Sequence, residues 1–310
     1  MMQQIEFYAM GCQMLVILES EHPLAAKCLA EVPAWFEAWE QSLSRFRPDS
    51  ELNYLNTHPG ESVAVSEVMW QVLLAALNAY RKSNRLVSPT ILPALETAGY
   101  DRSFDQLGSS VGGGIAQRTA VPADALEAIE LDKRKHTVRI PAGVRLDFGG
   151  VAKGWAAHQA MRQLRSLGPV LVDAGGDIAI SDRQSGDKRW PVGINDPLGE
   201  DEQLMLLMLG RSGVATSGRD YRHWLQAGAP RHHIIDPHTG TSAETDVGSA
   251  TVVAATVLGA EMAAKTVLIL GSLDGLDWLD SRRAYAGLLV LEDGSVQLSK
   301  GFEDYLWSQS

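Results

Sequence analysis

The stretch that decides the fold is LDFGGVAKGWAAHQAMRQL, residues 146–164. An apolar segment ends at Asp147, Gly149-Gly150 follow, and a helical pattern runs from about residue 151 to 167. Free N–H groups at a helix start attract anions, and Lys153 adds a full positive charge there. The stretch therefore predicts a strand–turn–helix connection that binds phosphate or pyrophosphate. A plain connection with a solvated lysine fits equally well, because the spacing matches neither the P-loop nor the dinucleotide-binding fingerprint.

The segments around this stretch alternate between helical and strand-like patterns. Helices are expected at 24–43 and at 66–80, and Ser66 suits the N-cap of the second one. A glycine-rich loop is expected at 108–117. Strands are expected at 5–18 with a turn at 10–11, at 138–140 and 144–146 as a hairpin, and at 170–172, 178–180, 204–209, 214–216, 251–254, 287–291 and 296–298. Because helices and hairpins are interleaved, the pattern favours an α+β fold with largely antiparallel sheets over a doubly wound parallel sheet.

Composition excludes several classes of function. The chain has 310 residues, of which 45% are hydrophobic and 21% charged, so it is globular, with room for one large domain or two smaller ones. Its net charge of −11 argues against binding to a nucleic acid backbone or anionic lipid. The longest apolar stretch, 249–271, has Glu261 and Lys265 at its middle, which argues against a membrane span. The start has no basic region before an apolar one, so we expect a cytoplasmic protein.

A second polar segment is HHIIDPHTG, residues 232–240, which combines histidines with a tight turn at Asp236-Pro237. Four histidines lie between His223 and His238, but on a chain punctuated by proline and glycine and without the spacing of metal ligands. The residues favour a single general base or a structural histidine over a shared metal ion.

Eight segments occur in an order that is far more specific than any one of them. They are AMGC (9–12), SRFRPDSELNYLN (44–56), SPTILPALETAGYD (88–101), LDFGGVAKG (146–154), VDAGGDIAI (172–180), VATSGRDYR (214–222), HHIIDPHTG (232–240) and SATVVAATVLGAEMAAKTVLILG (249–271). Together they resemble the ApbE family, the FAD:protein FMN transferases, over nearly the whole chain.

The resemblance implies an α+β fold related to the T-fold, in a single domain spanning 1–310 with FAD bound between two halves. It also implies two substrates, FAD and an acceptor protein. A threonine hydroxyl of the acceptor attacks the pyrophosphate of FAD, FMN becomes attached through a phosphoester bond, and AMP leaves. Such a reaction needs a pyrophosphate site, neutralisation of charge and a base for the hydroxyl proton.

The resemblance also assigns roles to individual residues. His233 matches the histidine implicated in the transfer step. Phe46 stands where tyrosine is usual, Ser88 where aspartate is usual, and His158 where aspartate is usual. The positions that match FAD contacts are Met10, Phe46, Val87, Ser88, Asp147, Lys153 and Ile235.

The expected metal site departs from the family's pattern. Members bind Mg²⁺ through a D-x-x-x-T pair on a helix and a main-chain oxygen that matches Gly150, whereas the pair here reads Glu261 and Lys265. A protonated lysine has no lone pair for a metal, and residues at i and i+4 are placed to pair with one another. Four alternatives follow: the ammonium replaces the metal, Mg²⁺ binds elsewhere, the protein binds or carries FAD without transferring FMN, or the site of a diverged relative has decayed.

Overall fold

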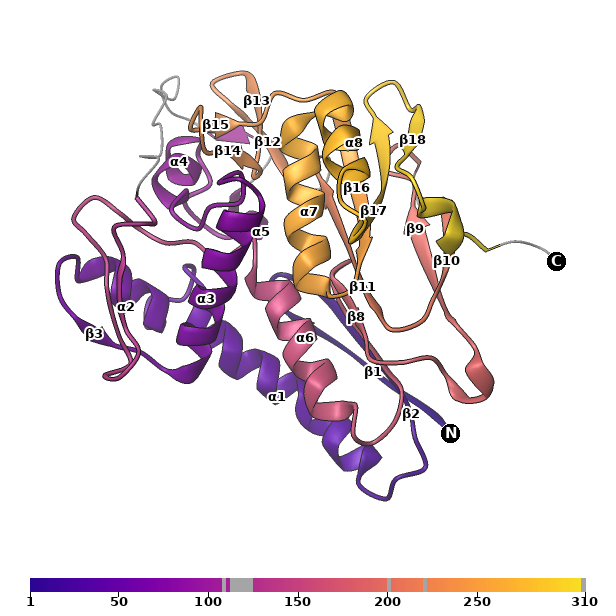
Figure 1. Cartoon of the computed structure of the whole chain (residues 1–310). Coiled ribbons are helices and arrows are strands. Elements are labelled where there is room, and N and C mark those ends of the chain that lie inside the picture. The colour runs from indigo at the N-terminus through magenta and orange to yellow at the C-terminus, as the bar shows by residue number, and fades with distance from the viewer. Residues whose placement is uncertain (108–109, 112–124, 200–201, 220–221, 308–310) are drawn as a thin grey trace. The chain divides into compact units, whose positions relative to one another are not determined.

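The structure, a computed structural model, describes residues 1–107, 110–111, 125–199, 202–219 and 222–307 (Figure 1). The chain divides into two compact units, and each is built from segments that are not contiguous in sequence. Unit 1 comprises Met1–Phe36, Lys153–Asp220 and Thr245–Ser310, and unit 2 comprises Glu37–Ala152 and Tyr221–Glu244. The helix α1 (Ala25–Leu43) runs from the first into the second.

Unit 1 is organised around an eight-stranded sheet in which every neighbouring pair is antiparallel. Its strands, in spatial order, are β1 (Met2–Ala9), β2 (Cys12–Glu19), β7 (Val170–Ala174), β8 (Ile178–Ile180), β11 (Ser212–Gly218), β16 (Val247–Ala254), β17 (Tyr285–Leu291) and β18 (Val296–Leu298). This sheet confirms the predicted fold class, because the chain combines helices with largely antiparallel strands.

The two faces of this sheet carry different partners, as the alternation of side chains along a strand requires. Ala215 and Ala254 pack against Ala260 of helix α7 (Val257–Leu270). Their neighbours Val214 and Val253 belong instead to the core of the opposite face. That core is covered by the hairpin of β9 (Trp190–Asn195) and β10 (Gln203–Leu209) and by the short helix η2 (Phe302–Tyr305). The helices α6 (Ala152–Leu164) and α8 (Ser272–Asp280) lie beside α7 (Figure 1).

Unit 2 is mainly helical, with three small sheets. Ser66 begins its longest complete helix by accepting the N–H of Met69 at 3.1 Å, which confirms the predicted N-cap. The helices are α2 (Glu51–Thr57), α3 (Glu67–Lys82), α4 (Leu92–Thr97) and α5 (Phe104–Leu107). The sheets are formed by β3 (Val63–Ala64), β5 (Glu130–Asp132) and β6 (Thr137–Arg139), by β4 (Ser110–Val111), β12 (His223–Gln226) and β13 (Ala229–His232), and by β14 (Ile235–Asp236) and β15 (Thr241–Ser242).

Most expected elements form, and one hairpin does not. Residues 144–146 are not a strand; β6 pairs instead with β3 and β5. The amide side chain of Asn56 binds both backbone groups of Leu146, at 2.7 Å to its N–H and 2.9 Å to its carbonyl oxygen. These two bonds replace the ladder that the predicted hairpin needs. The expected loop at 108–117 lies outside the described residues, apart from β4.

Two further expectations concern organisation. Within the part of the chain that the structure describes, no helix combines the length and apolar character needed to cross a bilayer. The single domain with FAD between two halves stays a prediction.

Replacing Asn56 by Ala removes the side chain that binds the N–H and the carbonyl oxygen of Leu146, and leaves these two buried groups without that partner. Because Asn56 is 7% exposed, we expect the free energy of unfolding to fall by about 2–4 kcal/mol. Chemical denaturation measures this change. The same substitution at the exposed Asn78 of α3 is the control, with an expected effect of about 0.5 kcal/mol or less. Equal effects at the two positions would contradict the role given to Asn56.

Candidate functional site

The predicted turn before α6 is held by the side chain of Asp147. One carboxylate oxygen accepts the N–H of Gly149 at 2.8 Å, and the other lies 2.8 Å from Nε of Arg45. The carbonyl oxygen of Phe148 then accepts the N–H of Ala152, the first residue of the helix, at 2.8 Å. Asp147 therefore fixes the turn and orients a guanidinium group at the same time, all within unit 2.

Arg45 lies between two aromatic rings. Its guanidinium carbon is 4.2 Å from the ring centroid of Phe46 and 4.6 Å from that of Tyr100, both cation–π distances. The side chain is 6% exposed, and its Nη2 is buried without a hydrogen-bond partner among the described residues. Because an unpartnered buried donor is costly, this atom marks a position where the acceptor group of a ligand is favoured.

Tyr100 belongs to the same aromatic group. Burial raises the pKa of its hydroxyl, and the positive charges of Arg222 and Arg45 only partly oppose that effect. Its ring also lies 5.4 Å from that of Trp224, whose indole N–H donates to Ala98 O at 2.8 Å. The hydroxyl therefore stays neutral at physiological pH, and the ring packs Arg45 against the core of unit 2.

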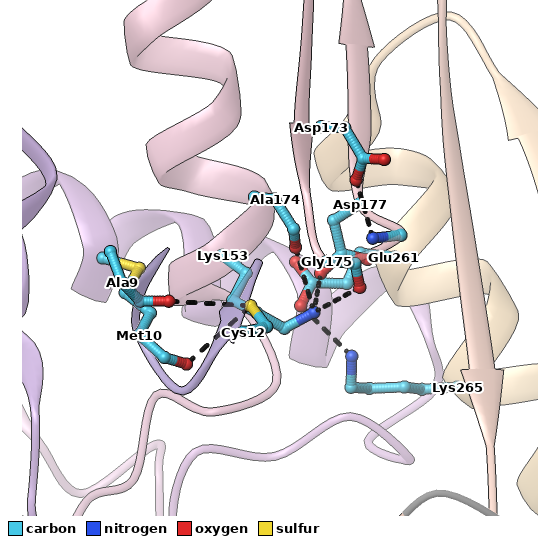
Figure 2. A network of polar contacts seen from close by, with 11 residues as sticks. Ala9, Met10, Cys12, Lys153, Asp173, Ala174, Gly175, Asp177, Glu261 and Lys265 are labelled. Carbon is cyan, nitrogen blue, oxygen red and sulfur yellow. Dashed lines mark hydrogen bonds and ion pairs between the residues drawn. The ribbon is translucent and has the colours of Figure 1, made fainter. Parts of the chain in front are cut away.

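Lys153, in the first turn of α6, lies in a network of polar contacts in unit 1 (Figure 2). Its Nζ is 2.6 Å from a carboxylate oxygen of Asp177 and 3.4 Å from the carbonyl oxygens of Ala174 and Gly175. Burial alone would lower the pKa of Lys153, but the negative charge of Asp177, with Cys12 and Glu261, raises it above its ordinary value. The lysine is therefore a permanent cation held at the glycine turn that joins β7 to β8.

That turn approaches the β1–β2 hairpin closely. Gly175 has a φ of 63°, and a Cβ there would lie 2.8 Å from Cβ of Cys12, so only glycine fits. The N–H of Gly176 donates to Asp173 at 2.7 Å. Burial nevertheless raises the pKa of Asp173 above its ordinary value, and the nearby charge of Asp177 adds to this. The hairpin turn and the glycine turn thus form one wall around Lys153.

Glu261 and Lys265, on successive turns of α7, belong to the same network (Figure 2). Nζ of Lys265 is 3.2 Å from a carboxylate oxygen of Glu261, as the i, i+4 spacing predicts. Glu261 is 1% exposed, and burial raises its pKa to about 7, an effect that Lys265 opposes. Helix α6 approaches this carboxylate at Gly154, where a side chain would collide with it. Four charged side chains, two lysines and two acids, therefore lie together.

The donor set around Lys265 does not fit Mg²⁺. This ion requires about six oxygen ligands in octahedral geometry, mainly carboxylates, carbonyls and water. Here an ammonium group takes the one carboxylate of the matched pair, and the described residues contain no group of three His, Cys, Asp or Glu side chains placed to hold a metal.

The remaining predicted residues lie in unit 2, except Met10, which is in the β1–β2 turn of unit 1. His233 lies between β13 and β14, and its Nδ1 is 3.4 Å from the carbonyl oxygen of Arg222. Because a carbonyl can only accept, this contact favours a proton on Nδ1 and a lone pair on Nε2. Ile235 is 2% exposed in the core of unit 2. Ser88 Oγ lies 2.9 Å from Oγ1 of Thr90.

The structure thus brings some predicted residues together within each unit. In unit 1, Lys153, Glu261 and Lys265 share one network. In unit 2, Asp147 and Phe46 meet through Arg45. Val87 and Gly150 also belong to unit 2. The roles of all these residues in binding and catalysis stay predictions.

Sequence reasoning missed two residues that the geometry makes prominent. Asp177 is 2% exposed and is the partner of Lys153, yet its only signal in the sequence is an acid directly after Gly175-Gly176 at the end of a strand. Arg45 precedes the aromatic residue of the motif SRFRPDS, and nothing in that motif reveals its stacking on Tyr100.

Comparison with known proteins places this geometry in a family. Residues 10–289 match the family model described as the ApbE family. The chain belongs to the ApbE family. A relative from Treponema pallidum, named FAD:protein FMN transferase, is 31% identical over 296 residues that cover 89% of this chain and 80% of the relative.

Solved structures of ApbE proteins share the fold. The ApbE protein of Thermotoga maritima superposes with a TM-score of 0.88 at 24% identity, over 99% of this chain and 100% of that one. The apo form of the flavinyl transferase ApbE of Pseudomonas stutzeri gives a TM-score of 0.80 at 21% identity, over 100% and 98% of the two chains. These two similarities establish the fold.

Replacing Asp177 by Ala leaves Lys153 without its buried counter-ion at a site that is largely shielded from water. Because breaking a buried ion pair strands a charge, we expect the free energy of unfolding to fall by about 3 kcal/mol. Thermal and chemical denaturation measure this loss. The control is Arg183→Ala in the same unit, which removes the exposed pair with Asp187 and has an expected loss of about 0.5 kcal/mol or less. A loss at Asp177 no larger than that of the control would refute the structural role of this pair.

Proposed function

We propose that this ApbE family member is an FAD:protein FMN transferase that attaches FMN from FAD to a threonine hydroxyl of an acceptor protein and releases AMP. The observation that carries the proposal is the family match over residues 10–289, together with the 31% identity to a relative of that name. Lys153, a cation held in the first turn of α6, supports it, because a pyrophosphate substrate needs positive charge at a defined position.

The proposed reaction conserves atoms and charge. The threonine oxygen forms a bond to the phosphorus of the FMN half of FAD. The bond from that phosphorus to the bridging oxygen breaks, and the bridging oxygen leaves as part of AMP. His233 accepts the hydroxyl proton at Nε2, since its Nδ1 faces a carbonyl oxygen. The proton then passes to the AMP phosphate or to water. His233 is thus the proposed general base.

FAD contacts are proposed in both units. Met10 and Lys153 provide them in unit 1, and Phe46, Val87, Ser88, Asp147 and Ile235 provide them in unit 2. Arg45 joins this set because its buried Nη2 needs an acceptor, which a carbonyl or phosphate oxygen of FAD supplies. Ile235 contributes through its backbone, since its side chain is enclosed in the core of unit 2.

Lys265 changes how charge is neutralised in the proposed site. Relatives with the D-x-x-x-T pattern are expected to use Mg²⁺, which polarises the pyrophosphate when bound. In this chain the ammonium groups of Lys153 and Lys265 hold positive charge near Glu261. We propose that these two lysines stabilise the phosphate oxygens directly. A cytoplasmic location and an acceptor protein as second substrate complete the proposal.

Lys265 also favours a second candidate function, an FAD carrier without transferase activity. A cation on a side chain supplies one charge where a magnesium ion supplies two, which is less stabilisation for the departing phosphate. One measurement distinguishes the two functions: the mass of a threonine-containing acceptor fragment after incubation with FAD. A gain equal to one FMN supports the transferase, and an unchanged mass with clear FAD binding supports the carrier.

Replacing His233 by Ala should reduce the rate of FMN transfer about 100-fold to 10,000-fold, because the hydroxyl proton loses its acceptor. The affinity for FAD, followed by quenching of flavin fluorescence, should stay within about threefold. The control is His238→Ala in the same segment, whose side chain is 62% exposed and whose loss should leave transfer unchanged. Equal transfer rates for His233→Ala and the parent would exclude His233 as the base.

Replacing Lys265 by Thr should allow Mg²⁺ to bind, because Glu261 is freed and a hydroxyl ligand is added. Calorimetric titration with MgCl₂ measures this directly, without any activity. The Lys265→Val variant also loses the charge, and valine has the shape of threonine without its hydroxyl. It therefore separates the effect of the added hydroxyl from that of the lost charge. We expect saturable binding to the threonine variant and at least about tenfold weaker binding to the valine variant and the parent. Tight Mg²⁺ binding by the parent would show that Lys265 does not take the place of the metal.

A further inference from the structure

A separate pocket of about 260 Å³ lies in unit 1, at the other end of α6 from Lys153. It is lined by the C-terminal half of α6, by β8, by the start of β11 and by the N-terminus of α7. Arg162, one of its lining residues, is nine positions beyond Lys153, which is about 14 Å along a helix. The pocket is therefore distinct from the charged network around Lys153.

The lining of this pocket is strongly basic in an acidic chain. His158, Arg162 and Arg165 come from α6 and Arg211 comes from the turn before β11, and no lining residue is Asp or Glu. In the described ranges, none of the three arginines forms an ion pair with a carboxylate, whereas Arg47 and Arg145 do. With 38 acidic and 27 basic residues in the chain, a cluster of unpaired cations goes against the average composition.

The three basic residues of α6 occupy one face of that helix. His158, Arg162 and Arg165 are spaced at i, i+4 and i+7, so their side chains lie above one another. The like charges of Arg162 and Arg165, three positions apart, destabilise the helix, and an anion bound between them would remove the repulsion. Burial lowers the pKa of His158, and the positive charges of Arg162 and Arg165, whose side chains are exposed, lower it further.

The start of α7 adds to this potential from the opposite wall. Thr256 is its N-cap, and its hydroxyl accepts the N–H of Gly259 at 3.2 Å, which leaves the preceding N–H groups without partners in the helix. The strand β11 packs closely on this helix start because Gly213 has no side chain. The positive end of the fourteen-residue helix α7 therefore adds to the positive potential of the basic side chains.

The pocket is not purely polar. Met161, Ala179 and Val257 are among the apolar residues in its lining, so a ligand with an organic part gains more contact there than a bare ion. Its volume is below the roughly 300–1,000 Å³ of pockets for drug-sized ligands, and a dinucleotide such as FAD exceeds it. We propose that this pocket binds a small phosphate monoester, with its phosphate on the arginines and its organic part against Met161 and Val257.

Calorimetric titration with ribose 5-phosphate, inorganic phosphate and ribose tests the assignment on the full chain. We expect ribose 5-phosphate to bind at one site, inorganic phosphate to bind more weakly and ribose to show no binding. Arg162→Gln and Arg211→Gln should each weaken binding of ribose 5-phosphate about tenfold, because each removes a charged hydrogen-bond donor. Thermal unfolding of each variant verifies that the substitution leaves the fold intact.

The matched control is Arg283→Gln, which removes an exposed arginine of the same unit outside the pocket and should change the affinity by less than about twofold. Equal weakening by this control would show non-specific attraction and overturn the proposal. So would the absence of saturable binding up to about 10 mM, or equal binding of ribose. Equal affinity for inorganic phosphate would overturn the assignment to an ester. Because FAD binding to Arg162→Gln should match that of the parent, failure here is separable from failure of the proposed transferase.

Discussion

The ion pair between Lys153 and Asp177 is the interaction on which the charged network of unit 1 depends. It joins the first turn of α6 to the glycine turn between β7 and β8, with Asp177 only 2% exposed. An isolated ion at that depth would be strongly disfavoured, so each group is stable there only because the other is present. The pair thereby fixes the direction of α6 and keeps a cation at a place where the chain would otherwise exclude one.

The second pair of the network, Glu261 with Lys265, extends the same principle to α7. A carboxylate this deeply buried needs a compensating positive charge, which either a metal ion or a neighbouring ammonium group can provide. Lysine provides it from within the chain, with no dependence on the concentration of a metal. It also gives up the directed coordination that a metal offers to a substrate, because an ammonium group is a point charge with three donors. The single position 265 thus decides between two kinds of electrostatic site.

Local features were predictable from the sequence, and contacts between distant segments were not. The cap at Ser66 and the glycine turn after Asp147 follow from residues within a few positions of each other, and both form. The hairpin at 138–146 failed because Asn56, 90 positions away, binds the backbone of Leu146. Among site residues, the i, i+4 pairing of Glu261 with Lys265 was visible in the sequence. The stacking of Arg45 was not, because Tyr100 comes from another part of unit 2.

The strand order of unit 1 has a consequence for how the protein emerges from the ribosome. The hairpin of β1 and β2 is synthesised well before β7, the sheet neighbour of β2, which begins at Val170, about 150 residues later. At a translation rate of roughly 5–20 residues per second, the edge of β2 stays unpaired for about 8–30 s before β7 is synthesised. During this interval the backbone donors and acceptors of a largely apolar strand are available to other nascent chains. Translation speed across the intervening residues therefore sets how long that strand edge stays unpaired.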